Sequence, residues 1–331
     1  MSAASAPSDK RRSGCRAAFG AGADVDTILS NGASRLRRAG ICGPLGRMRL
    51  ILLTCLVMIA FAANSVLNRL AVDSGAIDPR SFAVIRVVAG ALMLTLLVFA
   101  RRQRVPLLVG KRIGARVVGG GALTLYMVGF STAYLTLDAG LGALILFGVV
   151  QVTMFAVSAA SGTPANLRQI TGAGIAFGGL VWVLWPGGVV LVDSTGAALM
   201  AAAGVGWAFY TLAGRREPDA LSATAANFLY AVPLTLVAAL VAGGPWQAAP
   251  TGVALAVVSG TVTSGLGYAL WYSVLPRLAP SVAATVQLSV PVIALGGGVV
   301  LLGEAINARL IVGGALVIGG IALSVRVGTN R

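Results

Sequence analysis

The sequence predicts an all-α integral membrane protein with ten transmembrane helices, arranged as two inverted five-helix repeats. The first observation is composition: 57% of the 331 residues are hydrophobic and 11% are charged, whereas a soluble domain carries roughly a quarter charged residues. The second is a series of apolar runs of about 20 residues, the length that an α-helix needs to cross a bilayer. The third is a similarity between the two halves of the chain.

Residues 1–48 are polar, basic and without sustained periodicity, which predicts a disordered cytoplasmic tail. An alternative is that translation starts at Met48, directly before the first apolar run. A signal peptide ending near Ala63 is disfavoured, because the apolar run continues to about Val72.

Ten apolar runs follow the tail. Each must be helical, because an isolated backbone in hydrocarbon has no other way to satisfy its amide groups. Their residues do not alternate between polar and apolar as the strands of a membrane barrel do. The predicted helices cover residues 50–72, 81–100, 114–135, 138–159, 169–187, 195–213, 222–242, 252–273, 280–301 and 308–326.

Basic residues between the runs predict the orientation, since cytoplasmic loops collect Lys and Arg. With the N-terminus inside, the outer loops hold only Arg80 and Arg309. Both termini are therefore expected in the cytoplasm, with the chain in the cell (inner) membrane. The net charge of +15 thus reflects orientation and not nucleic-acid binding. The inner segments hold the basic tail, Arg101, Arg102, Arg104, Lys111, Arg112, Arg116, Arg168, Arg215, Arg216, Arg277, Arg326 and Arg331.

Histidine is absent, which excludes His-based general bases and the usual zinc sites. The three cysteines form no paired framework, and no phosphate-binding loop motif is present. We expect no catalytic residue, metal or cofactor. The expected partners are a small-molecule metabolite and the lipid bilayer, and a homodimer is left open.

A constant shift of 141 residues along the chain, called the repeat offset below, aligns the two halves. It places Asn166-Leu167-Arg168 on Asn307-Ala308-Arg309, and it brings Gly172, Gly178 and Gly179 onto Gly313, Gly319 and Gly320. Each half holds five helices, an odd number, so the second half must enter the membrane upside down. Inverted repeats suit alternating access around a midplane site.

Two stretches resemble the EamA-type family of the drug/metabolite transporter superfamily. They are Asp78-Pro79 followed by Ser81-Phe82-Ala83-Val84-Ile85-Arg86, and Pro291 followed by Leu301-Leu302-Gly303-Glu304. The resemblance implies EamA-like repeats at 50–187 and 195–326 and a protein that is not an enzyme. It also implies export or exchange of amino acids or other small metabolites. The chain departs from the family pattern at Val150 and Thr163.

Polar and aromatic residues inside the spans are the candidate substrate-binding groups, because polar groups in a membrane are costly. Arg86 can hold an anionic group; alternatively it snorkels to the interface or pairs with Asp73, Asp78 or Asp138. For the others the alternative is helix packing, for Pro291 a hinge or a plain kink in mid-helix. The candidates are Asn64, Arg86, Tyr126, Gln151, Trp207, Tyr210, Tyr268 and Gln287, with Pro291 as the hinge.

Two further roles are structural. Gly174 with Gly178, and Ala315 with Gly319, are expected to bring helix backbones close together. Glu304 is expected to cap the last helix or pair with Arg309. Two other functions stay open beside a secondary transporter. One is a non-transporting membrane scaffold. The other is an enzyme acting on lipid-linked substrates, which would require clustered acidic or histidine residues, and the sequence shows no such cluster.

Overall fold

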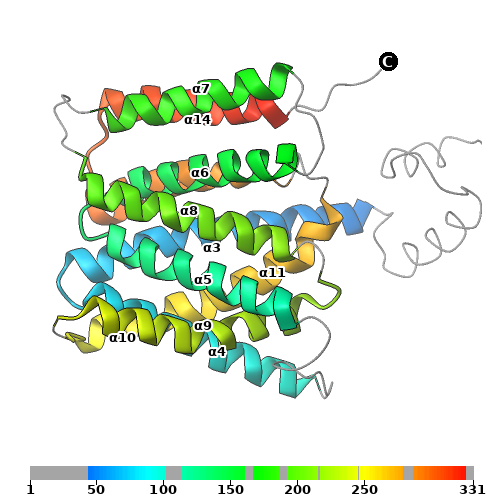
Figure 1. The fold of residues 1–331 in the computed structure, drawn as a ribbon, viewed down its shortest axis with the longest axis vertical. Helices are drawn as coiled ribbons and strands as arrows, with labels where there is room; N and C mark the ends of the chain where they lie inside the picture. Colours follow the sequence, from blue (N-terminus) through cyan, green and yellow to red (C-terminus); the bar gives the residue numbers. More distant parts are fainter. Residues whose placement is uncertain are drawn as a thin grey trace, which may run out of the picture. The chain divides into compact units, whose positions relative to one another are not determined.

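The computed structural model describes residues 44–101, 113–160, 167–185, 192–214, 217–244, 246–278, 283 and 286–325. In these parts the chain is helical and contains no strand (Figure 1). The chain divides into two units, Met1–Cys55 and Leu56–Arg331, and the described part of the first is the start of helix α3. The predicted tail lies outside the described residues up to residue 43, but its last residues are helical because α3 begins at Pro44.

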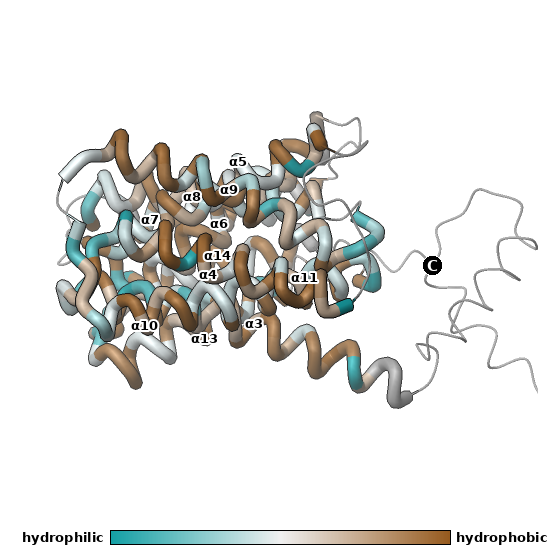
Figure 2. The backbone as a smooth tube through the Cα atoms, turned by 90° about the horizontal axis from the view of Figure 1, so that it is seen from below, coloured by the Kyte–Doolittle hydropathy of each residue, from teal (hydrophilic) through white to brown (hydrophobic). Residues whose placement is uncertain are grey.

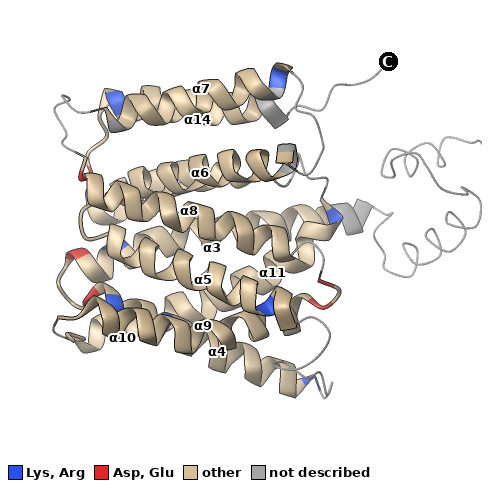
Figure 3. Cartoon of the chain, in the orientation of Figure 1, with Lys and Arg blue, Asp and Glu red and all other residues tan. Residues whose placement is uncertain are grey.

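The helices follow the apolar runs closely. Seven of them are long and apolar enough to cross a membrane, and three shorter apolar helices cover Ile170–Val183, Ser289–Leu302 and Ala308–Leu323. Hydrophobic residues dominate the helices (Figure 2), and the charged residues of the described part occur mostly near helix ends (Figure 3). The first six helices are α3 (Pro44–Asp73), α4 (Pro79–Ala100), α5 (Ile113–Ala133), α6 (Ala139–Ala160), α7 (Leu167–Leu184) and α8 (Ser194–Gly214). The others are α9 (Ala220–Ala242), α10 (Pro250–Val258), η2 (Ser259–Leu266), α11 (Gly267–Val274), η3 (Leu275–Arg277), α13 (Ser289–Gly297), η4 (Gly298–Leu302) and α14 (Ala308–Val325).

Two helices begin with the same cap, and the repeat offset places one cap on the other. Asp78 accepts hydrogen bonds from the backbone N–H groups of Arg80 and Ser81 at 3.0 and 3.1 Å, and from the Ser81 hydroxyl. Asp219 accepts the equivalent bonds from Leu221 and Ser222 at 3.2 and 3.4 Å, and from the Ser222 hydroxyl at 2.5 Å. Such caps satisfy backbone donors that the first helical turn leaves unpaired.

The loop before α4 pairs with the loop after α9. Asp78 donates its backbone N–H to the Gln247 carbonyl at 2.8 Å, and Ala249 donates to the Ala76 carbonyl at 2.7 Å. The Gln247 N–H in turn donates to the Asp78 carboxylate at 2.9 Å. The end of α9 therefore lies beside the start of α4, so these two packed helices run antiparallel.

Helices α7 and α14 lie side by side (Figure 1) and contact each other through glycines. A Cβ atom on Gly179 would lie 2.9 Å from the Gly313 carbonyl oxygen, and one on Gly320 would lie 2.6 Å from the Gly172 carbonyl oxygen. The two contacts are equivalent in the repeat, because the repeat offset places Gly179 on Gly320 and Gly172 on Gly313. The prediction for Gly174, Gly178 and Gly319 was wrong, because nothing lies within 4 Å of a Cβ placed there.

Candidate functional site

Arg86 is buried inside the bundle. Its side chain is 0% exposed, and no other charged residue of the described part is buried. It neither snorkels to an interface nor pairs with a carboxylate: Asp73 and Asp138 lie against Arg69, and Asp78 against Arg80. A buried charge without a counter-ion is costly, so it needs other polar partners.

Hydroxyl groups supply these partners. Arg86 Nε donates to Ser264 Oγ at 2.8 Å, and Nη2 donates to the hydroxyls of Tyr268 and Tyr126 at 2.9 and 3.2 Å. The guanidinium carbon lies 5.1 Å from the ring centre of Phe130 and 5.5 Å from that of Tyr126. Nη1 is buried and has no hydrogen-bond partner among the described residues. One edge of the guanidinium is thus left for an acceptor that the described protein does not provide.

A close helix crossing places Arg86 against Ser264. Segment η2 is a π-helix, a form that recurs at functional sites. A Cβ on Gly260 would lie 2.2 Å from the Arg86 carbonyl oxygen, and one on Gly90 would lie 2.9 Å from the Gly260 carbonyl oxygen. Only glycine allows this approach, which brings the hydroxyl of Ser264 within reach of α4.

Asn64 hydrogen-bonds to the same π-helix. Its Oδ1 accepts bonds from Ser259 Oγ at 2.9 Å, from Ser264 Oγ at 3.2 Å and from the Thr263 hydroxyl, and its Nδ2 donates to the Thr263 carbonyl at 3.2 Å. Asn68, one turn further along α3, instead donates to Ser131 Oγ on α5 at 2.9 Å. Asn64 therefore joins two helices, and a substrate contact there stays a prediction.

A small cavity of about 10 Å³ is lined in part by Tyr126 and Tyr268, the two tyrosines that accept hydrogen bonds from Arg86. Trp207 packs edge-on against Tyr268 with ring centres 4.8 Å apart, and it stacks on Tyr210 at 5.4 Å. Its indole N–H donates to Gln287 Oε1 at 3.3 Å. Six of the predicted residues are thus connected by direct contacts: Arg86, Tyr126, Trp207, Tyr210, Tyr268 and Gln287. The cavity is lined by Phe61, Ser65, Tyr126, Phe130, Leu146, Phe147, Trp207 and Tyr268.

Two predicted residues lie apart from this cluster. Gln151 is half-buried on α6 and does not line the cavity. Pro291 lies in the first turn of α13, which begins at Ser289, and the residues at 286 and 287 are also helical, so a turn at Leu288 separates two helical stretches. A proline favours such a break, and its role as a hinge or a plain kink stays a prediction.

Ser259, Thr263 and Ser264 were not predicted as site residues. The sequence pattern that could have identified them is a run of small hydroxyl residues inside an apolar span, Ser259-Gly-Thr-Val-Thr-Ser264. Phe61 and Phe130 gave no such signal, because apolar residues at a cavity resemble those in the core.

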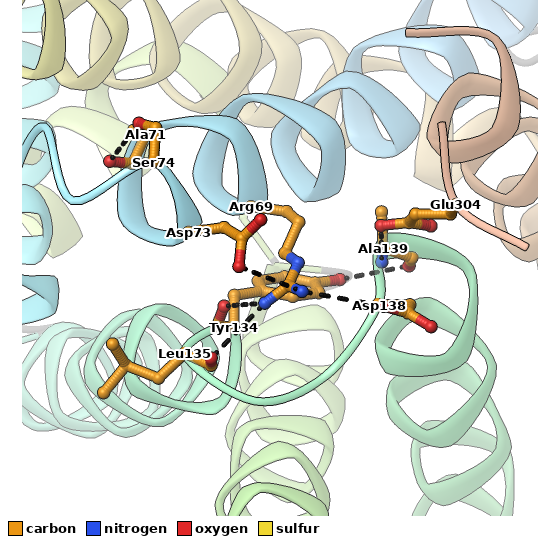
Figure 4. A network of polar contacts seen from close by, with 9 residues as sticks. All are labelled: Arg69, Ala71, Asp73, Ser74, Tyr134, Leu135, Asp138, Ala139 and Glu304. Carbon is orange, nitrogen blue, oxygen red and sulfur yellow. Dashed lines mark hydrogen bonds and ion pairs between the residues drawn. The ribbon is translucent and has the colours of Figure 1, made fainter. Parts of the chain in front are cut away.

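A polar network joins helix ends away from the cavity (Figure 4). Arg69 lies 3.1 Å from the Asp73 carboxylate and 3.6 Å from that of Asp138, and donates to the Tyr134 carbonyl at 2.9 Å. Glu304 accepts the Ala139 N–H at 2.7 Å and so caps α6. Burial raises the pKa of Glu304 above its ordinary value, and the nearby Asp138 carboxylate adds to this.

Glu304 therefore does not cap the last helix as predicted. Asn307 does so, since its side-chain oxygen accepts the Leu310 N–H at 2.7 Å. Nor is Arg309 bound to Glu304. It donates to the Trp182 carbonyl at 2.8 Å and to that of Trp185, at the end of α7.

Comparisons with known proteins give relatives of similar length and fold. The EamA-like transporter family model matches residues 194–326. An uncharacterized protein of Pseudomonas aeruginosa is 44% identical over 83% of this chain and 94% of its own length. The threonine/homoserine exporter RhtA of Escherichia coli is 31% identical over 63% of this chain and 67% of its own length, as is that of Salmonella typhimurium. A solved crystal structure shares the fold, with a TM-score of 0.57 at 19% identity, covering 82% of this chain and 97% of that one.

Proposed function

The chain belongs to the EamA-like transporter family and is a membrane transporter of small metabolites, and we propose that it exports or exchanges solutes bearing a carboxylate group, amino acids foremost. The observation that carries this proposal is Arg86, a buried cation without a counter-ion and with Nη1 unpartnered among the described residues. Arginine donors match a carboxylate in both charge and geometry.

The aromatic residues of the cavity support recognition of a small zwitterion, for which the cavity has to widen, because about 10 Å³ holds no more than one water molecule. A carboxylate on Arg86 would place the rest of the solute beside Trp207 and Tyr268, whose ring faces attract an ammonium group. The described cavity lining contains no carboxylate, so the aromatic rings are the groups there that can attract the ammonium group of the solute. Threonine and homoserine, the solutes named for RhtA, have this chemistry and are the first to test.

We further propose ten spans in two inverted repeats that work by alternating access. The seven long and three shorter apolar helices occur in the order of the ten predicted segments. The caps of Asp78 and Asp219 and the reciprocal glycine contacts of α7 and α14 obey the repeat offset. We propose that the protein lies in the inner membrane with both termini in the cytoplasm. Whether it forms a homodimer stays open.

The test is efflux from cells that express the protein and are loaded with threonine, homoserine and related solutes. We expect wild-type protein to raise external threonine or homoserine, and Arg86→Gln, which keeps polar groups but loses the charge, to abolish this. Arg80→Gln is the matched control, because Arg80 is an arginine in the first turn of the same helix, α4. Unchanged efflux by Arg86→Gln at equal membrane abundance would refute the carboxylate role. Efflux of amines without a carboxylate would contradict the proposed substrate class.

A further inference from the structure

A second buried polar cluster lies next to the Arg86 site and is joined to it through Tyr210, which stacks on Trp207. Asn227 on α9, Tyr210 on α8 and Tyr272 on α11 are 3%, 0% and 1% exposed. Asn227 Nδ2 donates to the Tyr272 hydroxyl at 3.4 Å, and that hydroxyl donates to the Tyr210 carbonyl at 2.7 Å. The hydroxyl of Tyr210 is buried beside the side chains of Tyr272, Thr224 and Asn227, and no described residue meets it in good hydrogen-bond geometry. A buried hydroxyl that its neighbours do not fully satisfy can accept a hydrogen bond from a ligand or water, or donate one to it.

Asn227 occupies the position in the second half that Arg86 occupies in the first. Each lies eight positions after a capping aspartate, Asp78 or Asp219, so the repeat offset places one on the other. At roughly 1.5 Å per residue each lies about 12 Å inside its helix. Because α4 and α9 are antiparallel, these equal depths are measured from opposite ends of the bundle.

A column of stacked rings joins the two positions. Trp207, which lines the cavity beside Arg86, stacks on Tyr210 at 5.4 Å with an interplanar angle of 28°. Tyr210 stacks on Tyr272 at 4.9 Å and 29°. The column thus runs from the cavity to Tyr272, whose hydroxyl accepts a hydrogen bond from Asn227.

Glycines close the second cluster in this conformation. A Cβ on Gly119 would lie 2.7 Å from Asn227 Oδ1, and one on Gly214 would lie 2.2 Å from the Tyr272 ring. Helices α5 and α8 therefore approach the cluster too closely to leave room for a solute. A solute can enter only when these helices separate, as alternating access requires.

We propose that Asn227, Tyr210 and Tyr272 form an inner station, a second substrate-binding position that the solute occupies when the transporter opens toward the end where α9 begins. This proposal rests on the proposed function, since it concerns the same solute. The station offers amide and phenol groups as hydrogen-bond donors to a carboxylate, but no charge. Neutral donors hold a carboxylate less tightly than a guanidinium does, so the two openings of the transporter differ in affinity.

The first experiment tests access to the station without requiring transport. In a chain whose cysteines 15, 42 and 55 are replaced by serine, Asn227→Cys is treated with a membrane-impermeant anionic methanethiosulfonate. We expect reaction from the membrane face at which α9 begins, and none from the other face. Thr235→Cys, a buried position two turns further along α9, is the matched control and should not react from that face. Absence of reaction of Asn227→Cys from both faces, or reaction only from the opposite face, would overturn the station.

The second experiment measures threonine transport in vesicles of both orientations. Removing one hydrogen bond to a charged group costs roughly 1.5–3 kcal/mol, so Tyr210→Phe and Asn227→Leu should raise the KM at the station's face at least about tenfold. The KM at the opposite face should change less than about twofold. Thr54→Val, which removes a buried hydroxyl near the start of α3, should change neither value. Equal effects at both faces would refute the station. Cysteine reaction without transport of any solute would instead refute the proposed function alone.

Discussion

The paired caps of α4 and α9 allow one interaction to be isolated within the chain. Asp78→Ala removes the helix cap and also the acceptor of the Gln247 N–H. Asp219→Ala removes a cap of the same geometry that accepts no hydrogen bond from another loop of the described chain. Both variants are made in an Arg80→Gln background, because Arg80 lies 3.4 Å from the Asp78 carboxylate whereas Leu221 occupies the equivalent position after Asp219. The second variant then serves as a matched control for the first, and the difference measures the link between the loops before α4 and after α9.

The expected magnitudes follow from the contacts. Losing a cap costs about 1 kcal/mol. Leaving the Gln247 N–H without its acceptor costs roughly 1–3 kcal/mol more if water does not replace it. Asp78→Ala should therefore lower the free energy of unfolding by about 2–4 kcal/mol and Asp219→Ala by about 1 kcal/mol, a difference of several degrees in Tm.

The assay is unfolding of the purified protein in detergent, followed by loss of helical circular dichroism, at neutral and acidic pH. Burial acts to raise the pKa of Asp78, but hydrogen bonds from Ser81, Gln247 and Arg80 outweigh it and lower this pKa below its ordinary value. The stabilisation by Asp78 is therefore complete above the ordinary carboxyl pKa and is lost as the pH falls through the lowered value. Equal destabilisation by the two variants at neutral pH would refute the role of the Gln247 contact.

The remaining predictions concern Glu304, Gly260 and Asn307. Because the pKa of Glu304 is raised, the folded protein binds its proton more tightly than the unfolded protein, and the stability should fall as the pH rises through that pKa. The chain has only two glutamates, so ¹³Cδ-glutamate NMR can follow the titration of Glu304, with Glu217→Gln to assign the resonances. An unshifted Glu304 resonance would contradict the burial argument. Gly260→Ala should abolish transport and destabilise the protein by at least about 1–3 kcal/mol, because its Cβ would overlap the Arg86 carbonyl; a fully active variant would show that this crossing is not required. Asn307→Ala should cost about 1 kcal/mol through loss of the α14 cap, measured by thermal unfolding, whereas no change in Tm would argue against the cap.

The sequence predicted the positions of the helices well, since burial in a bilayer requires long apolar runs that composition reveals directly. Arg86 was also predicted, because a charge inside such a run is rare. The partners of Arg86 were not: Ser264 is 178 residues away, and the crossing that brings it near depends on Gly260 and Gly90. The same holds for Glu304, which caps a helix 165 residues away from it in sequence. Such pairings depend on tertiary packing, which no local pattern contains.

The hydroxyl of Ser264 has a single hydrogen, and its two neighbours fix where that hydrogen points. Arg86 Nε can only donate, so Ser264 Oγ accepts from it, and the hydrogen is directed to the amide oxygen of Asn64. This one-way chain ends at an acceptor that bears no charge. A change of Asn64 to aspartate, which differs by one amide group, would place an anion at the end of the chain and give Arg86 a counter-ion through one intervening hydroxyl. That anion would neutralise the guanidinium that we propose to bind the carboxylate of the solute, and the amide at residue 64 avoids this.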